Sequence, residues 1–172
     1  MAILSVRKYG DAVLRRRAQP VHEVTPDVRR LAEDMIETMY DEAGIGLAAP
    51  QIGASIRLMV VGDERGRNPR ALVNPAITEQ GGSVTAEEGC LSIPGIFADV
   101  ARAEWVQVEA HDLEGQPVSI RAKGFHARVL QHEMDHLDGI LFIDRLDAVT
   151  RDRIKRKIKK DGLTESHRAF AL

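Results

Sequence analysis

The motif His132-Glu133-x-x-His136 constrains this chain more than any other feature of its sequence, because its spacing has a function only on a helix. Residues four apart on an α-helix lie about 40° apart around the axis and about 6 Å apart along it. Two imidazoles so placed can bind one metal ion, and the glutamate beside the first can take a proton from water on that ion. The alternative is a surface helix with two solvated histidines. We therefore predict a metal-binding helix over residues 124–137. Its predicted buried positions are Phe125, Val129, Leu130 and Met134.

Cys90, the only cysteine of the chain, is the candidate third ligand. A tetrahedral site needs a third protein ligand if its fourth position is to stay open for water. The sequence after His136 lacks the Gly-x-x-His continuation that some metallopeptidases use for this purpose, and Cys90 can fill the gap. Gly89 before it allows a tight backbone. The alternative for a lone cysteine is a small buried apolar residue.

A first helix is predicted to begin after Thr25, which is a good N-cap, with Pro26 in the first turn. Gly44 is the predicted C-cap. Apolar residues recur at helical spacing and should face the core: Val28, Leu31, Ala32, Met35, Ile36 and Met39.

Strands are predicted further along the chain, at residues 56–61, 71–74, 84–86, 104–111 and 117–122. Residues 104–111 alternate between polar and apolar side chains, as in a half-buried strand. Residues 44–53 read as a tightly built loop, and Asn74-Pro75 and Gly81-Gly82 as turns.

Three segments together resemble the peptide deformylase family: residues 44–51 (GIGLAAPQ), 88–92 (EGCLS) and 131–139 (QHEMDHLDG). They follow the order and separations usual in that family, and the similarity extends over residues 3–147. Ala12 stands where the family commonly has proline, which is a detail of a turn. With the predicted elements, the resemblance implies an α+β fold with antiparallel or mixed sheets around a central metal-binding helix, an N-terminal helix and a C-terminal helix. We expect one catalytic domain over residues 1–172.

The resemblance also implies roles for individual residues. Cys90, His132 and His136 would bind one divalent metal ion, and Glu133 would be the general base. The Gln51 side chain and the Leu91 backbone N–H would stabilise the oxyanion that forms at the formyl group. The substrates would be N-formylmethionyl peptides at the start of nascent chains, and formate would be released.

Two further expectations concern the substrate and the metal. By resemblance, Ile45 and Gly46 would hold the peptide and its first side chain. A thiolate with two imidazoles suits Fe(II), Zn(II), Co(II) or Ni(II), and the family is known for ferrous iron in cells.

Two acidic residues near the motifs have predicted supporting roles. Glu88 should be partly buried and paired with a cation such as Arg102, which would fix the loop that carries Cys90. Its alternative is an exposed acid. Asp135 either orients a histidine or makes a structural hydrogen bond. His126 lies six residues before His132, a poor match to one helix face, and receives no ligand role.

Composition bounds the compartment and the partners. A single cysteine excludes an internal disulfide, and a net charge of -2 gives no general affinity for polyanions. No secretory signal or membrane-spanning segment is visible, so we expect a cytoplasmic protein. An organellar protein without its transit peptide would look the same.

Residues 148–172 form a distinct C-terminal part, predicted as a basic helix and a loose tail. Seven lysines and arginines crowd into residues 151–160, with Ile154 and Ile158 as a thin apolar seam. One interpretation is a solvated helix packed through its isoleucines. The other is contact with RNA phosphate, supported by the terminal helix with which bacterial-type deformylases dock on the ribosome.

Three functional hypotheses follow: an active deformylase, a metallopeptidase of another kind, and a non-enzymatic ribosome-associated protein with a structural metal. Release of formate from formylated peptides would separate the first from the second. The presence of Glu133 and Gln51 argues against the third, because a structural metal site needs neither.

Overall fold

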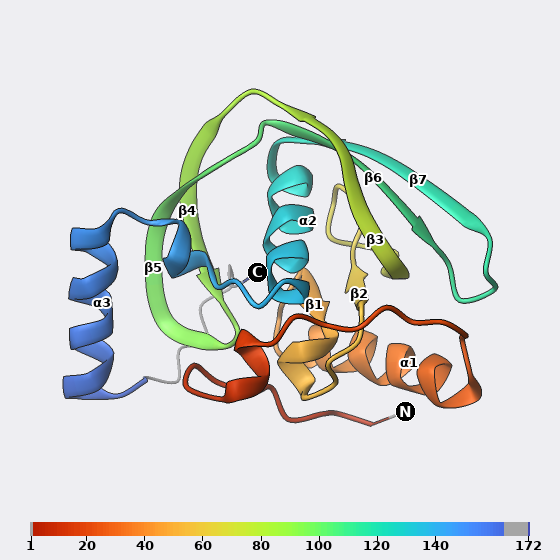
Figure 1. Ribbon diagram of the computed structural model, residues 1–172, viewed down its shortest axis with the longest axis horizontal. Coiled ribbons are helices and arrows are strands. Elements are labelled where there is room, and N and C mark those ends of the chain that lie inside the picture. Colours follow the sequence, from red (N-terminus) through yellow and green to blue (C-terminus); the bar gives the residue numbers. More distant parts are fainter. Residues whose placement is uncertain (1, 164–171) are drawn as a thin grey trace.

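The computed structural model describes residues 2–163 and residue 172 (Figure 1). The elements follow in this order: η1 (Ala12–Arg15), α1 (Pro26–Asp41), β1 (Gly46–Ala48), η2 (Ala49–Ile52), β2 (Leu58–Val61), β3 (Arg70–Gly81), β4 (Val84–Cys90), β5 (Ile93–Arg102), β6 (Trp105–His111), β7 (Pro117–Lys123), α2 (Gly124–Leu137), η3 (Phe142–Arg145) and α3 (Ala148–Asp161).

Two antiparallel sheets enclose α2, as the α+β expectation requires (Figure 1). The larger sheet has the order β1-β2-β3-β6-β7, and β4 pairs with β5 in a separate ribbon. The apolar side of α2 packs on the larger sheet in one buried cluster, which includes Val106, Val108, Val129 and Leu130. Its histidine side meets the end of β4. The helix is therefore placed between the two sheets, where side chains from both can converge.

The start of α1 agrees with the prediction, but its end differs. The Thr25 hydroxyl accepts a hydrogen bond from the Val28 N–H, at 3.2 Å. At the other end the C-cap is Glu42, and Ala43 takes the left-handed conformation with φ +55°. The Gly44 N–H then donates to the Met39 carbonyl at 2.9 Å. This is a Schellman ending, in which Gly44 lies two positions after the C-cap and is not, as was predicted, the C-cap itself.

The strand predictions were correct in type; β3, β4 and β7 extend beyond the predicted ranges, whereas β2 and β6 begin later than predicted. Asn74 does not end its strand: it lies at an irregularity inside β3, with φ +50°. Its side-chain amide exchanges two hydrogen bonds of 2.8 Å with the backbone of Val21, which stabilises this conformation. The segment 93–102, for which no strand was predicted, forms β5, and residues 46–48 of the predicted loop form β1. In β6, Val106, Val108 and Ala110 are buried, as the alternation predicted.

The helix α2 has the predicted bounds, Gly124–Leu137, but one buried position was wrong. Phe125 is 48% exposed, in a first turn where Gly124 is also exposed and His126 is half-buried. Every residue from Ala127 to Leu137 is buried. The helix is therefore enclosed on nearly all sides along its last three turns.

The C-terminal part begins with α3, capped by the Asp147 side chain, which accepts from the Thr150 N–H. Ile154 is buried and Ile158 packs beside it, so the prediction of a helix packed through its isoleucines is confirmed. The tail was expected to be loose. Residues 164–171 lie outside the described part, but Leu172 is 1% exposed, which contradicts that expectation at this residue. Among the described residues, no helix is long and apolar enough to cross a membrane.

Candidate metal centre and active site

His132 and His136 lie in the middle of the molecule on the last two turns of α2. Each is 1% exposed, and their ring centroids are 5.0 Å apart in an edge-to-face arrangement. Burial of this kind excludes the alternative of two solvated histidines on a surface helix.

Cys90 approaches the two histidines from the end of β4. Its Sγ lies 3.4 Å from His136 Nε2, and one ligand atom from each of the three residues lies within 4.8 Å of the others. Ordinary Zn–S and Zn–N bond lengths in a tetrahedron place sulfur and nitrogen about 3.5 Å apart. The side chains are thus spaced as one small ion requires.

The position of Cys90 depends on the glycine before it. A Cβ on Gly89 would lie 2.5 Å from a ring carbon of Phe97 on β5, closer than any real contact. The pairing of β4 with β5 also shifts register between Glu88 and Cys90. The missing side chain and the irregularity together turn Cys90 towards α2, in agreement with the tight backbone predicted there.

Glu88 is buried, at 1% exposure, and its carboxylate contacts several basic side chains. Both of its oxygens accept from Arg102 at 2.9 Å, which confirms the predicted pairing. One oxygen also lies 2.9 Å from His132 Nδ1. Burial opposes the charged form of Glu88, but the hydrogen bonds from Arg102 and His132 lower its pKa to about 2. The carboxylate thereby binds the outer nitrogen of His132 and directs Nε2 towards Cys90.

Arg128 was missed by the sequence reasoning. Its buried guanidinium donates to Glu88 at 2.6 Å and to the carbonyls of Val100 and Val84, at 2.8 and 2.7 Å. The signal was its position four residues before His132, on the same face of the helix. Arg128 therefore joins β4, β5 and α2 beneath the three candidate ligands.

Asp135 makes structural ion pairs and does not contact a histidine. Its carboxylate lies 2.5 Å from Arg102 and 2.7 Å from Arg145. Of the two roles that the sequence left open, the structural one is therefore confirmed.

Gln51 is completely buried in η2 and points its amide nitrogen at the cluster. Its Oε1 accepts from the Ala48 N–H at 3.0 Å, so the oxygen is already engaged. Its Nε2 lies 3.2 Å from Ser92 Oγ and 3.7 Å from Cys90 Sγ. A hydrogen-bond donor is thus held beside the candidate ligands.

Glu133 has the least satisfied polar group near the centre. It is 0% exposed, and neither carboxylate oxygen has a hydrogen-bond partner among the described residues. Burial raises its pKa to about 7. A buried carboxylate without a partner is costly unless another group completes the site. Its pKa suits a group that accepts and returns a proton near neutral pH.

Strand β1 passes directly across this carboxylate. A Cβ on Gly46 would lie 2.9 Å from Glu133 Cγ, and one on Gly44 would lie 2.9 Å from Leu91 Cδ1. Gly46 therefore lies against Glu133, and Gly44, just before β1, lies against Leu91 in the turn after Cys90. Within residues 2–163 and residue 172, β1 pairs only with β2, so it is an edge strand of the larger sheet. Ile45, between the glycines, packs against the apolar cluster around α2.

The donor set fits a divalent metal ion. His132 Nε2 is buried and has no partner among the described residues, although its Nδ1 is fixed by Glu88. Burial disfavours protonation of His132, but Cys90 and Glu88 raise its pKa to about 10. Burial keeps the pKa of His136 well below its ordinary value. Because these ligands bind metal only when deprotonated, we expect metal affinity to increase with pH.

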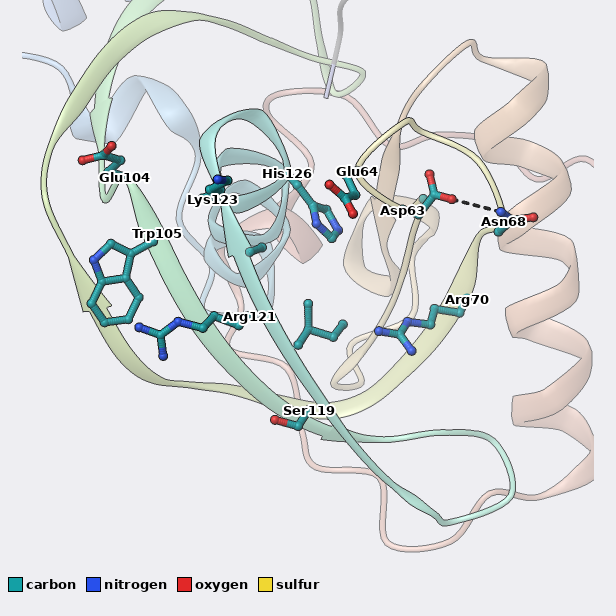
Figure 2. Close-up of a pocket in the computed structure, with 13 residues that line it drawn as sticks. Asp63, Glu64, Asn68, Arg70, Glu104, Trp105, Ser119, Arg121, Lys123 and His126 are labelled. Carbon is teal, nitrogen blue, oxygen red and sulfur yellow. Dashed lines mark hydrogen bonds between the residues drawn. The ribbon is translucent and has the colours of Figure 1, made fainter.

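A separate pocket of about 940 Å³ lies beyond the first turn of α2 (Figure 2). It is lined by the 62–70 loop and by the start of β6 and the end of β7, where Arg121 stacks on Trp105 at 4.3 Å. None of the predicted site residues lines it. His126 does, which agrees with its exclusion from the ligand set.

The profile of the polypeptide deformylase family matches residues 3–152. The chain belongs to this family. It is 51% identical to the peptide deformylase of Alkalilimnicola ehrlichii over 162 residues, which cover 93% of this chain and 91% of that one. It also resembles a peptide deformylase structure from Legionella pneumophila, with 44% identity, a TM-score of 0.87 and coverage of 92% and 95%. A structure from Ehrlichia chaffeensis in complex with actinonin has 36% identity, a TM-score of 0.87 and coverage of 94% and 99%.

Peptide deformylases are metal-dependent hydrolases that remove the N-formyl group from nascent polypeptides. Family membership therefore agrees with the first of the three functional hypotheses and not with the other two. The fold around α2 is also the one seen in the solved relatives.

Proposed function

We propose that this chain hydrolyses the formyl group of N-formylmethionyl peptides at the centre formed by Cys90, His132 and His136, with Glu133 as the general base. The observation that carries the proposal is the Glu133 carboxylate, buried without a partner on the same helix as the two histidines. A structural metal site has no use for such a group, whereas a hydrolase needs a base there.

Cys90, His132 and His136 would hold one divalent ion, and we propose Fe(II) in cells, with Zn(II), Ni(II) and Co(II) as substitutes. Such an ion, when bound, acidifies water and polarises the formyl oxygen. Glu88 supports the site by holding the His132 ring in the orientation that presents Nε2.

Glu133 would accept the proton of the attacking water and return it to the departing amine. Burial favours both transfers, because it raises the pKa of Glu133 to about 7 and keeps bulk water from competing for the proton.

Gln51 and Leu91 would stabilise the negative charge that develops on the formyl oxygen. The Gln51 amide nitrogen is held towards Cys90 because its oxygen is occupied by Ala48. The Leu91 N–H follows the candidate ligand in the chain. Two fixed donors of this kind need little rearrangement during the reaction, and each is typically worth about 10²–10³ in rate.

Ile45 and Gly46 would hold the peptide. As an edge strand among the described residues, β1 would offer backbone groups to an extended chain, as strand edges do in peptide recognition. Gly46 keeps the peptide close to Glu133, because any side chain there would occupy the intervening space. Ile45 adds apolar contact for the first side chain.

The test measures formate release from a formylmethionyl peptide by metal-loaded protein, with actinonin as a candidate inhibitor. Glu133→Ala should keep its metal content and lose at least about 10² in kcat, the typical share of a general base. Glu87→Ala, at an exposed glutamate near the site, is the matched control and should remain active. Full turnover by Glu133→Ala with bound metal would overturn the assigned base.

We also propose that α3 contacts ribosomal RNA, in a cytoplasmic protein that meets nascent chains as they emerge. Lys155, Lys157 and Lys159 are exposed on α3, and the described residues supply no ion-pair partner for them. Substituting Lys155 and Lys159 by glutamine should weaken ribosome binding and reduce its salt dependence. Arg30→Gln, at an exposed arginine of α1, is the control. Equal binding by both variants would exclude the RNA contact.

A further inference from the structure

Leu172 lies beside the candidate ligand Cys90, far along the chain from the elements that build the candidate metal centre. Its side chain is 1% exposed and belongs to the same buried apolar cluster as Ala48 and Val129. Ile45 packs against that cluster as well. The apolar surface beside the candidate base is therefore already covered by a residue of the chain itself.

The backbone of Leu172 is paired with the turn that carries Cys90. Its N–H donates to the Gly89 carbonyl at 3.2 Å, and its main-chain oxygen accepts from the Leu91 N–H at 3.5 Å. These two bonds form the pattern of a parallel bridge opposite Cys90. Burial and directional pairing together hold Leu172 beside the candidate ligand Cys90, as a bound peptide residue would be held.

One of these bonds uses a group needed for the reaction. The Leu91 N–H is the backbone donor proposed for the oxyanion, and a single N–H cannot serve Leu172 and a formyl oxygen fully at once. The Leu172 side chain also fills space in the apolar cluster against which Ile45 packs. A formylated peptide can therefore enter only when Leu172 leaves.

We propose that Leu172 is an internal ligand of the active-site cleft that competes with the formylated peptide. The inference rests on the proposed function, because it assigns a regulation to that same site. Competition of this kind multiplies the apparent KM by one plus the ratio of closed to open molecules and leaves kcat unchanged. Closure of nine molecules in ten would raise KM about tenfold.

The test compares Leu172→Asp with the unmodified chain. A carboxylate at this position should not remain in the apolar cluster, so the variant should be open. We expect its KM for a formylmethionyl peptide to fall at least threefold, with kcat unchanged. Val149→Asp adds the same charge at a residue of α3 that is 75% exposed, and its KM should equal that of the unmodified chain.

A second measurement requires no turnover. In the Zn(II)-loaded protein, the NMR amide signal of Leu91 should shift in Leu172→Asp and stay in place in Val149→Asp, because only the first loses the hydrogen-bond acceptor. Equal KM values together with an unchanged Leu91 signal would overturn the inference. If no variant released formate, the proposed function would fail, and the Leu91 signal alone would decide whether Leu172 occupies the cleft.

Discussion

Replacement of Arg128 by methionine tests whether the buried charge network supports the metal centre. The side chain of Arg128 is 5% exposed, and that of its partner Glu88 is 0% exposed. The change removes one charge-assisted hydrogen bond and two bonds to carbonyls. Breaking a buried ion pair typically costs about 3–5 kcal/mol. Because Glu88 keeps Arg102 and methionine keeps the apolar stem, we expect the lower end, about 3 kcal/mol.

The assay is urea unfolding followed by circular dichroism, with Tm as a second measure. A loss of about 3 kcal/mol corresponds to a fall in Tm of roughly 6–12 °C for a domain of this size. Arg30→Met is the control, because this arginine is 70% exposed and its ion pair with Asp27 should contribute under about 0.5 kcal/mol.

The double variant Arg128→Met with Glu88→Gln separates the pair from the rest of the site. If the two side chains stabilise each other, the double variant should lose less than the sum of the single losses. A stability of Arg128→Met within about 1 kcal/mol of the parent would refute the reasoning, because the network would then carry no net stabilisation.

Three further outcomes follow from the site. Burial raises the pKa of Glu133 to about 7, and the base works only when deprotonated, so kcat/KM should fall as pH drops below neutrality. A bound cation moves this decrease to lower pH. A kcat/KM that stays constant down to about pH 5 would contradict the assignment of Glu133 as the base. Removal of the metal with a chelator should lower Tm by roughly 5–10 °C, as expected for loss of an ion present at 100 times its Kd. The same treatment should leave the Tm of Cys90→Ser almost unchanged, because this variant lacks the thiolate that binds the ion. Gly46→Ala should reduce kcat/KM at least about tenfold with an unchanged free energy of unfolding, because its Cβ would lie 2.9 Å from Glu133 Cγ. Full activity of this variant would show that β1 does not restrict the space beside Glu133.

The features predicted correctly from the sequence depend on residues close together in the chain. The bounds of α2, the N-cap at Thr25 and the buried face of β6 agree with the prediction. Each depends on side-chain period or on a cap within one turn, so neighbouring residues carry the whole signal. The deformylase motifs are also short, which made the family recognisable before the fold was known.

The features that were missed depend on packing between distant segments. Phe125 fits the apolar pattern of α2, but no layer covers the first turn. Strand β5 contains Pro94 and Gly95, which resemble a turn, and Gly95 does take a positive φ of +82°; β5 is defined by its pairing with β4 on both sides of these residues. A local pattern gives the type of an element and cannot show what lies across from it.

The sequence by itself determined the family, the metal-binding helix and the residue types of the site. Only the tertiary structure decided that Cys90 meets His136, 46 residues away, and that Arg128 joins Arg102 on Glu88. It alone placed Leu172 against the same turn. The physical reason is that helix formation is decided by short-range hydrogen bonds and side-chain spacing, whereas the convergence of buried charges depends on how whole sheets and helices exclude water together.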